Sequence, residues 1–246
     1  MKKLLQLALA GMVVGSCAKF PDGGAAGNNT QVRFRMTVAG RIKPNYVYIV
    51  AIRWAKDATP FDQERGPIPV IASPWGNGFV AGRANVFVRW DQFQSPAYQA
   101  FQFSDAIPDG TPPVTGTAYL RQWAFKSIPL NVLDVDTENG GRTIEFTLDM
   151  SQIAETPSDI PLIRALQVNF LTMDRVPQDP DNGSKFWDGL GANDSVFDAN
   201  DFIQFSVDQA NTYSNSSGIF SDREPTGDTP DPDLDIVDWS VQVIKP

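Results

Sequence analysis

Histidine is absent from this sequence of 246 residues. The absence excludes Ser-His-Asp and Cys-His nucleophilic catalysis, and it excludes zinc or non-haem iron sites built on imidazole. Carboxylates, lysine, tyrosine and arginine remain for proton transfer, and oxygen atoms remain as ligands for a hard metal ion. Because the chain also has no recognisable catalytic motif, we expect a protein that is not an enzyme.

Cysteine occurs once, at Cys17, so the chain cannot form an internal disulfide. Lys2 and Lys3 precede a short apolar run at 4–14 that ends just before this cysteine. The run is too short to span a bilayer, which needs about 20 apolar residues. A positive start followed by such a run is typical of a secretory signal peptide, which is removed from the mature chain.

The residues that end this run, Val14-Gly15-Ser16-Cys17, resemble the lipobox of bacterial lipoproteins. The resemblance implies cleavage before Cys17 and lipidation of Cys17, which supplies the several acyl chains that stable membrane anchoring requires. The alternative is an ordinary secreted protein in which Cys17 has no such role. The second mature residue would be Ala18 and not an aspartate, which resembles the pattern of lipoproteins sorted to the outer membrane. We therefore expect a lipid-anchored protein of the cell envelope. If the cell is Gram-negative, the pattern favours the outer membrane over the inner one, and the choice of membrane stays open.

Basic residues are outnumbered by acidic ones, 20 against 29, which gives a net charge of -9. Such a chain repels the phosphates of nucleic acids, so we expect no nucleic-acid partner. The excess of carboxylates has two interpretations that composition leaves open. It keeps the protein soluble, or it holds divalent cations.

Long helical patterns are lacking, and alternating apolar and polar residues take their place. At 31–39 Val32, Phe34 and Met36 alternate with polar residues, which predicts a half-buried strand. The segment 46–54 is apolar on both faces and predicts a central strand covered on both sides. Further strands are expected at 79–90, 98–103, 117–125, 130–136 and 142–150 (joined by an Asn-Gly turn), 166–173, 202–207 and 237–244.

About ten short strands separated by turns, with no βαβ alternation, predict an all-β fold. We expect a single antiparallel β-sandwich with long acidic loops. The domain organisation predicted from the sequence is a lipoprotein signal peptide at 1–16, a flexible Gly-rich tether at 17–30 and one β-sandwich domain at 31–246.

An acidic, Gly-rich loop at 174–201 contains a candidate calcium site. Asp179, Asp181 and Asn182, followed by Gly183, resemble the opening of a calcium-binding loop, in which alternate side chains supply oxygen ligands around a tight turn. The full loop spacing is not met, and no glutamate stands at the expected distance. The alternative is a solvated turn, because turns use the same residue types.

A second acidic run lies near the C-terminus. Its members are Asp222, Glu224, Asp228, Asp231, Asp233, Asp235 and Asp238. Crowded carboxylates repel one another unless a cation or solvent screens them. The run predicts either a second cation site or an extended, Pro-rich connection whose charges face water.

Two of the six tryptophans stand in loop patterns beside glycines, Trp75 and Trp187. A loop tryptophan forms a platform for the apolar face of a sugar ring, with a neighbour such as Asp188 accepting hydrogen bonds from the hydroxyls. The alternative is that each indole is buried beneath its loop and pins it, since large aromatics are highly buried on average. The candidate ligand-binding residues are therefore Trp75, Trp187 and Asp188.

Several stretches resemble an uncharacterised group of exported bacterial β-proteins: MTVAGRIKPNYVYIVAI, GPIPVIASPWGNGFVAG, VNFLTMDRVP and PDLDIVDWSVQV. The resemblance implies an architecture and no mechanism. The strand-rich layout is also similar, more loosely, to β-sandwiches of the DOMON and family 9 carbohydrate-binding type, and it transfers no binding residue.

Three hypotheses of function follow from these features. The first is a membrane-anchored surface lipoprotein whose non-catalytic sandwich binds a ligand such as a glycan, with calcium as its cofactor. The second is a structural or assembly protein of the envelope that docks another protein. The third is a glycan hydrolase that uses a pair of carboxylates about 5 to 9 Å apart.

Overall fold

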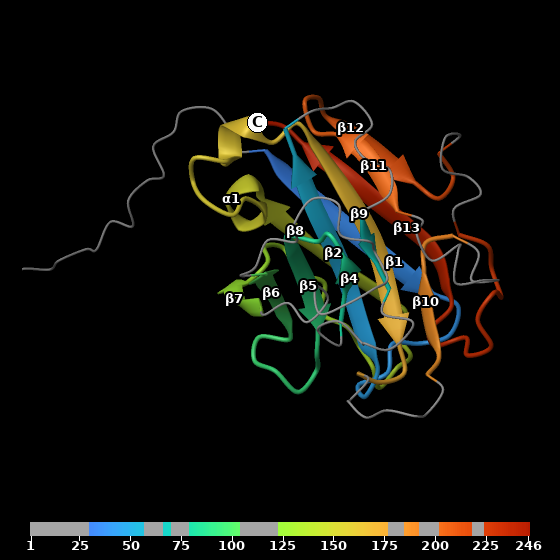
Figure 1. Cartoon of the computed structure of the whole chain (residues 1–246). Helices are drawn as coiled ribbons and strands as arrows, with labels where there is room; N and C mark the ends of the chain where they lie inside the picture. The colour runs from blue at the N-terminus through green and yellow to red at the C-terminus, as the bar shows by residue number, and fades with distance from the viewer. Residues whose placement is uncertain are drawn as a thin grey trace, which may run out of the picture.

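The computed structural model describes residues 30–56, 66–69, 79–103, 123–176, 185–191, 202–217 and 224–246. Two antiparallel sheets face each other across a common core, with the strands of one sheet crossing behind those of the other (Figure 1). The described helices are short: α1 (Met150–Ile153) and the 3-10 helix η2 (Ile160–Leu162). The prediction of an all-β sandwich is therefore confirmed.

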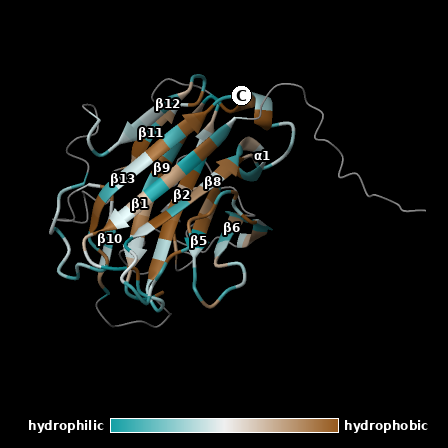
Figure 2. Ribbon diagram, turned by 180° about the vertical axis from the view of Figure 1, so that it is seen from behind, coloured by the Kyte–Doolittle hydropathy of each residue, from teal (hydrophilic) through white to brown (hydrophobic). Residues whose placement is uncertain are grey.

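The first sheet has four strands. Their order across the sheet is β12 (Asn211–Ser214), β13 (Ile236–Ile244), β1 (Gln31–Val38) and β8 (Thr143–Asp149). The last strand of the chain thus pairs with the first one, and both are central. Bands of brown and teal alternate along β1 and β13 in the view from behind, because one face packs on the core and the other faces solvent (Figure 2).

The second sheet has seven strands. Along the main path they are β10 (Trp187–Gly189), β9 (Ala165–Met173), β2 (Val47–Ala55), β5 (Val86–Trp90), β6 (Tyr98–Phe103) and β7 (Trp123–Ser127), and β11 (Ile203–Ser206) also pairs with β9. A separate two-stranded sheet joins β3 (Pro67–Ile68) to β4 (Ala81–Gly82).

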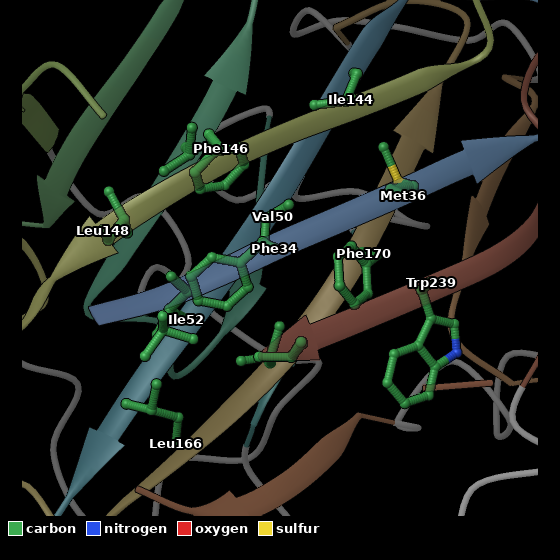
Figure 3. Close-up of a cluster of buried hydrophobic side chains, with 14 of the residues drawn as sticks. Phe34, Met36, Val50, Ile52, Ile144, Phe146, Leu148, Leu166, Phe170 and Trp239 are labelled. Carbon is green, nitrogen blue, oxygen red and sulfur yellow. The ribbon is translucent and has the colours of Figure 1, made fainter. Parts of the chain in front are cut away.

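The main core lies between the two large sheets. Figure 3 shows side chains from β1, β8 and β13 directed toward side chains from β2 and β9: Phe34, Met36, Ile144, Phe146, Leu148 and Trp239 against Val50, Ile52, Leu166 and Phe170. Phe170 and Trp239 stack across the two sheets, with ring centroids 5.9 Å apart. Burial of each such side chain stabilises the fold by about 2 to 3 kcal/mol.

A second apolar cluster covers the other face of the seven-stranded sheet. Ile49 and Ala51 of β2 belong to this cluster, whereas their neighbours Val50 and Ile52 belong to the main core. The prediction that this segment is a strand covered on both faces is confirmed. All nine residues of β9 are buried for the same reason.

Three local predictions were wrong. The segment 130–136 forms no strand and contacts β8 through an isolated bridge at Leu130. The segment 79–90 does not form one long strand, because Gly82 adopts a left-handed φ of 70° and the ladder stops before β5 begins. The acidic segment 174–201, predicted as a loop, contains the short strand β10.

Candidate metal centre

Strand β10 places Asp188 and Trp187 on opposite sides of its sheet. Asp188 lies opposite Thr172 of β9, and Trp187 lies opposite Met173. Successive side chains on a strand point to opposite faces. Trp187 accordingly packs against the second apolar cluster, whereas Asp188 points toward the four-stranded sheet and is fully buried. These two candidate ligand-binding residues therefore do not converge on one surface.

The carboxylate of Asp188 connects the two sheets. Its Oδ2 accepts a hydrogen bond from the backbone N–H of Ile236, the first residue of β13, at 2.6 Å, and its Oδ1 accepts one from the N–H of Gly189 at 2.9 Å. Thr172 makes a parallel connection by donating its hydroxyl to the carbonyl of Leu234 at 2.7 Å. The edge of one sheet is thereby fixed against the start of a central strand of the other.

The segment that leads into β13 brings further carboxylates to the same place. The N–H of Gly227 donates to both carboxylate oxygens of Asp235, at 3.0 and 3.1 Å. Gly227 has a φ of 85°, a left-handed conformation that favours glycine and lets the chain turn there. This turn places Asp228 beside Asp235, and both lie next to Asp188 of β10.

Three aspartates therefore meet at one point with Glu224 buried near them, and we call the four residues the acidic centre: Asp188, Glu224, Asp228 and Asp235. Carboxylate oxygens of the three aspartates all lie within 4.8 Å of one another. Asp188 and Asp235 are buried, and Asp228 is half-buried. Two unit charges at that separation repel by roughly 3 kcal/mol at an effective dielectric constant of 20. Carboxylates this close are unfavourable when ionised without a compensating positive charge.

Glu224 is the most informative member of the centre. Its side chain is only 4% exposed, and neither carboxylate oxygen has a hydrogen-bond partner among the described residues. Burial, followed by the charges of Asp188, Asp228 and Asp235, raises the pKa of Glu224 to about 12. A buried, unpartnered carboxylate requires an explanation, and a bound cation supplies one.

The residues of the acidic centre fit a hard divalent cation. Calcium binds six to eight oxygens at about 2.3 to 2.6 Å, and carboxylates are its commonest side-chain ligands. Two ligands on opposite sides of such an ion lie about 5 Å apart. The carboxylate oxygens of the three aspartates lie within 4.8 Å of one another, which fits that spacing. Zinc fits less well, because structural zinc sites use thiolate and imidazole and this chain has no histidine.

The remaining acids of the same segment are neutralised differently, and we call Asp231 and Asp233 the paired acids. Asp233 forms an ion pair with Lys43 at 2.5 Å and accepts a hydrogen bond from the N–H of Arg41 at 2.8 Å. Asp231 accepts one from the hydroxyl of Tyr46 at 2.7 Å. Burial opposes ionisation of Asp233, but the contacts with Lys43 and Arg41 outweigh it and lower the pKa of Asp233.

The C-terminal acidic run is therefore neither a single site nor an extended connection of solvated charges. Glu224, Asp228 and Asp235 enter the acidic centre, and Asp231 and Asp233 contact lysine and tyrosine. The cation site in this run stays a prediction, and the sequence did not predict that Asp188 would lie beside it. Nothing in the local pattern links residue 188 to residue 235, since the pairing of β10 with β9 and the docking of β13 create that contact.

The other candidate site residues lie outside the described part of the chain. They are Cys17, Trp75, Asp179, Asp181 and Asn182. The lipobox, the predicted calcium loop and one of the two tryptophan platforms therefore stay predictions.

Comparison of the chain with models of known protein families, with curated proteins and with solved structures found no match. The resemblance to exported β-proteins, to DOMON domains and to family 9 carbohydrate-binding modules stays an expectation from the sequence. In the described segments no helix has the length and apolar character needed to cross a membrane.

Proposed function

We propose that this chain is a non-catalytic, calcium-binding β-sandwich of an exported, lipid-anchored surface protein. The observation that carries the calcium site is the acidic centre, with buried Glu224 unpartnered among the aspartates. The centre is closed by burial, so it suits an ion that stabilises the fold better than one that must reach a substrate. A ligand such as a glycan would then bind elsewhere on the sandwich.

Calcium titration of the purified mature domain tests the proposal. We expect isothermal calorimetry to show that calcium binds at the acidic centre and that Glu224→Gln weakens this binding at least tenfold. The substitution keeps the shape of the side chain, removes one charge and breaks no side-chain hydrogen bond. Unchanged calcium affinity in Glu224→Gln would overturn the assignment.

Two controls separate this site from the other acidic residues. Asp238→Asn removes an exposed carboxylate from the same part of the chain and should leave calcium binding unchanged. The double variant Asp179→Asn, Asp181→Asn removes the carboxylates of the loop predicted from sequence. If that variant loses calcium binding and Glu224→Gln does not, the ion belongs to that loop and not to the acidic centre.

The proposed location of the protein rests on the N-terminal pattern, since Cys17 follows an apolar run and ends a segment that resembles a lipobox. Labelling of bacterial cells that express the chain with a radioactive fatty acid should modify the wild type and leave Cys17→Ser unlabelled. Equal labelling of the two proteins, or none of either, would contradict lipidation at Cys17.

A further inference from the structure

We infer that a cation at the acidic centre links the two sheets, so that β10 and the turn at 224–228 keep their native positions only while the cation is bound. The inference rests on the proposed calcium site and adds a conformational role to it. It concerns one end of the sandwich and not the fold as a whole.

The ligands come from elements that are separate in the sequence and in the sheets. Asp188 lies on β10, the edge strand of the seven-stranded sheet. Asp235 directly precedes β13, a central strand of the four-stranded sheet, and Glu224 and Asp228 lie on the turn before it. A cation bound by the three aspartates would hold an edge strand, a turn and the other sheet together through one set of contacts.

The unpartnered carboxylate of Glu224 indicates that the native arrangement is incomplete by itself. Glu224 is only 4% exposed, and it lies near the carboxylates of three aspartates. Without a cation the ionised aspartates repel one another, and separation of the elements that carry them relieves the repulsion. The hydrogen bonds from Gly227 to Asp235 and from Ile236 to Asp188 would break in that movement, because their acceptors belong to the repelling group.

The rest of the sandwich does not depend on this centre. Pairing of β1 with β8 and β13 extends over their lengths, and the main core between the sheets is apolar. Proteins open locally where few apolar contacts hold a segment, while the core stays closed. Strand β10 has only three residues, so it is a natural place for such an opening.

Hydrogen exchange measured by mass spectrometry tests the inference on the mature domain in calcium and in EDTA. We expect peptides that contain the amides of Gly189, Gly227 and Ile236 to exchange at least tenfold faster in EDTA. Peptides from β1 and β8 should exchange equally in both conditions. A calorimetric titration of the same sample reports whether calcium binds.

The outcomes separate the inference from the proposed function. Calcium binding with no change in exchange at these amides would overturn the link between the sheets and leave the calcium site in place. Absence of calcium binding would overturn both.

The variants test the electrostatic cause. In EDTA, Glu224→Gln should exchange more slowly at these amides than the wild type, because burying a glutamine beside the aspartates costs less than burying a glutamate. Asp238→Asn should exchange as the wild type does. Exchange in Glu224→Gln as fast as in the wild type would overturn this electrostatic cause, and if this variant does not fold, the wild type with and without calcium decides the inference.

Discussion

Two groups of carboxylates lie on one short segment, 224–235, and they differ in what surrounds them. The paired acids, Asp231 and Asp233, contact Lys43, the N–H of Arg41 and the hydroxyl of Tyr46. In the acidic centre, neither Glu224 nor Asp235 forms an ion pair with a lysine or arginine of the described chain. The first group has its partners within the protein, whereas in the second the carboxylate of Glu224 is buried without a hydrogen-bond partner.

This difference shows that the number of acidic residues in a stretch does not reveal what they do. Both groups are built from the same residue types, and both hold the segment before β13 in place. A carboxylate that is half-buried beside a lysine stabilises the fold on its own. A carboxylate buried among others stabilises the fold only with a cation, and that contrast can be tested by pH, by calcium and by substitution.

The largest effect is expected from pH in the absence of calcium. Glu224 has a pKa of about 12 in the fold and an ordinary value of 4.5 when unfolded. Above pH 4.5 the unfolded chain therefore releases a proton that the folded chain keeps, so stability falls as pH rises, by about 1.4 kcal/mol per pH unit. In EDTA, the melting temperature of the wild type should fall with rising pH between pH 5 and 8. For each pH unit it should fall by about 3 to 6 °C more than the melting temperature of Glu224→Gln. Equal slopes for the two proteins would contradict the assignment of this pH dependence to Glu224.

Calcium should produce the next largest effect. At a free concentration of 100 times its dissociation constant, an ion that binds only the folded state stabilises it by about 2.7 kcal/mol. Differential scanning fluorimetry should show the melting temperature rising by about 5 to 11 °C. Asp188→Asn should lose most of this rise. In EDTA, the melting temperature of Asp188→Asn should differ less from that of the wild type than it does in calcium, because one repelling charge has been removed. A full calcium response in Asp188→Asn would place the ion elsewhere.

The paired acids should respond to substitution and not to calcium. Lys43→Met removes the ammonium beside Asp233 and should lower the free energy of unfolding by about 1 to 2 kcal/mol, because a partly buried carboxylate loses its partner. A double-mutant cycle with Asp233→Asn should give a coupling of about 1 kcal/mol by urea unfolding. The coupling should be the same in calcium and in EDTA, and a calcium-dependent value would show that the two groups act as one.

The smallest effect is expected at Asp238, which is exposed on β13. Asp238→Asn removes an acidic charge that belongs to neither group, so the free energy of unfolding should change by less than about 0.5 kcal/mol. Urea unfolding in calcium and in EDTA measures this change in the free energy of unfolding. A larger change in calcium alone would extend the cation site beyond the acidic centre.

The sequence allowed the long strands to be predicted and the short ones to be missed. Strand β1 has a strict alternation of buried and exposed residues, and β2 is apolar on both faces, so each pattern is readable within its own segment. Strands β10 and β12 have three and four residues, too few for a periodicity to appear. The segment 130–136 has the composition of a strand, but its ladder with β8 is limited to an isolated bridge between Leu130 and Thr147.

The acidic centre could not be predicted from the sequence, for a related reason. The acidic run at the C-terminus predicted a cation site as one of two alternatives, because crowded carboxylates need screening. Whether a given aspartate meets a lysine or another aspartate depends on which segment packs against it. Lys43 comes from the turn before β2, and Asp188 comes from the edge of the seven-stranded sheet. Both contacts are long-range, and no local pattern specifies them.

The pairing of the first strand with the last one has a consequence for how the chain acquires its structure. Gln31 of β1 lies opposite Ile244 of β13, so this ladder joins positions at the two ends of the domain. Such a fold has a high contact order, and it folds slowly because a very long loop must close before the ladder forms. On the ribosome, the nascent β1 has no central neighbour until β13 has been synthesised. A stop codon that removes β13 should therefore abolish the four-stranded sheet and not merely shorten it.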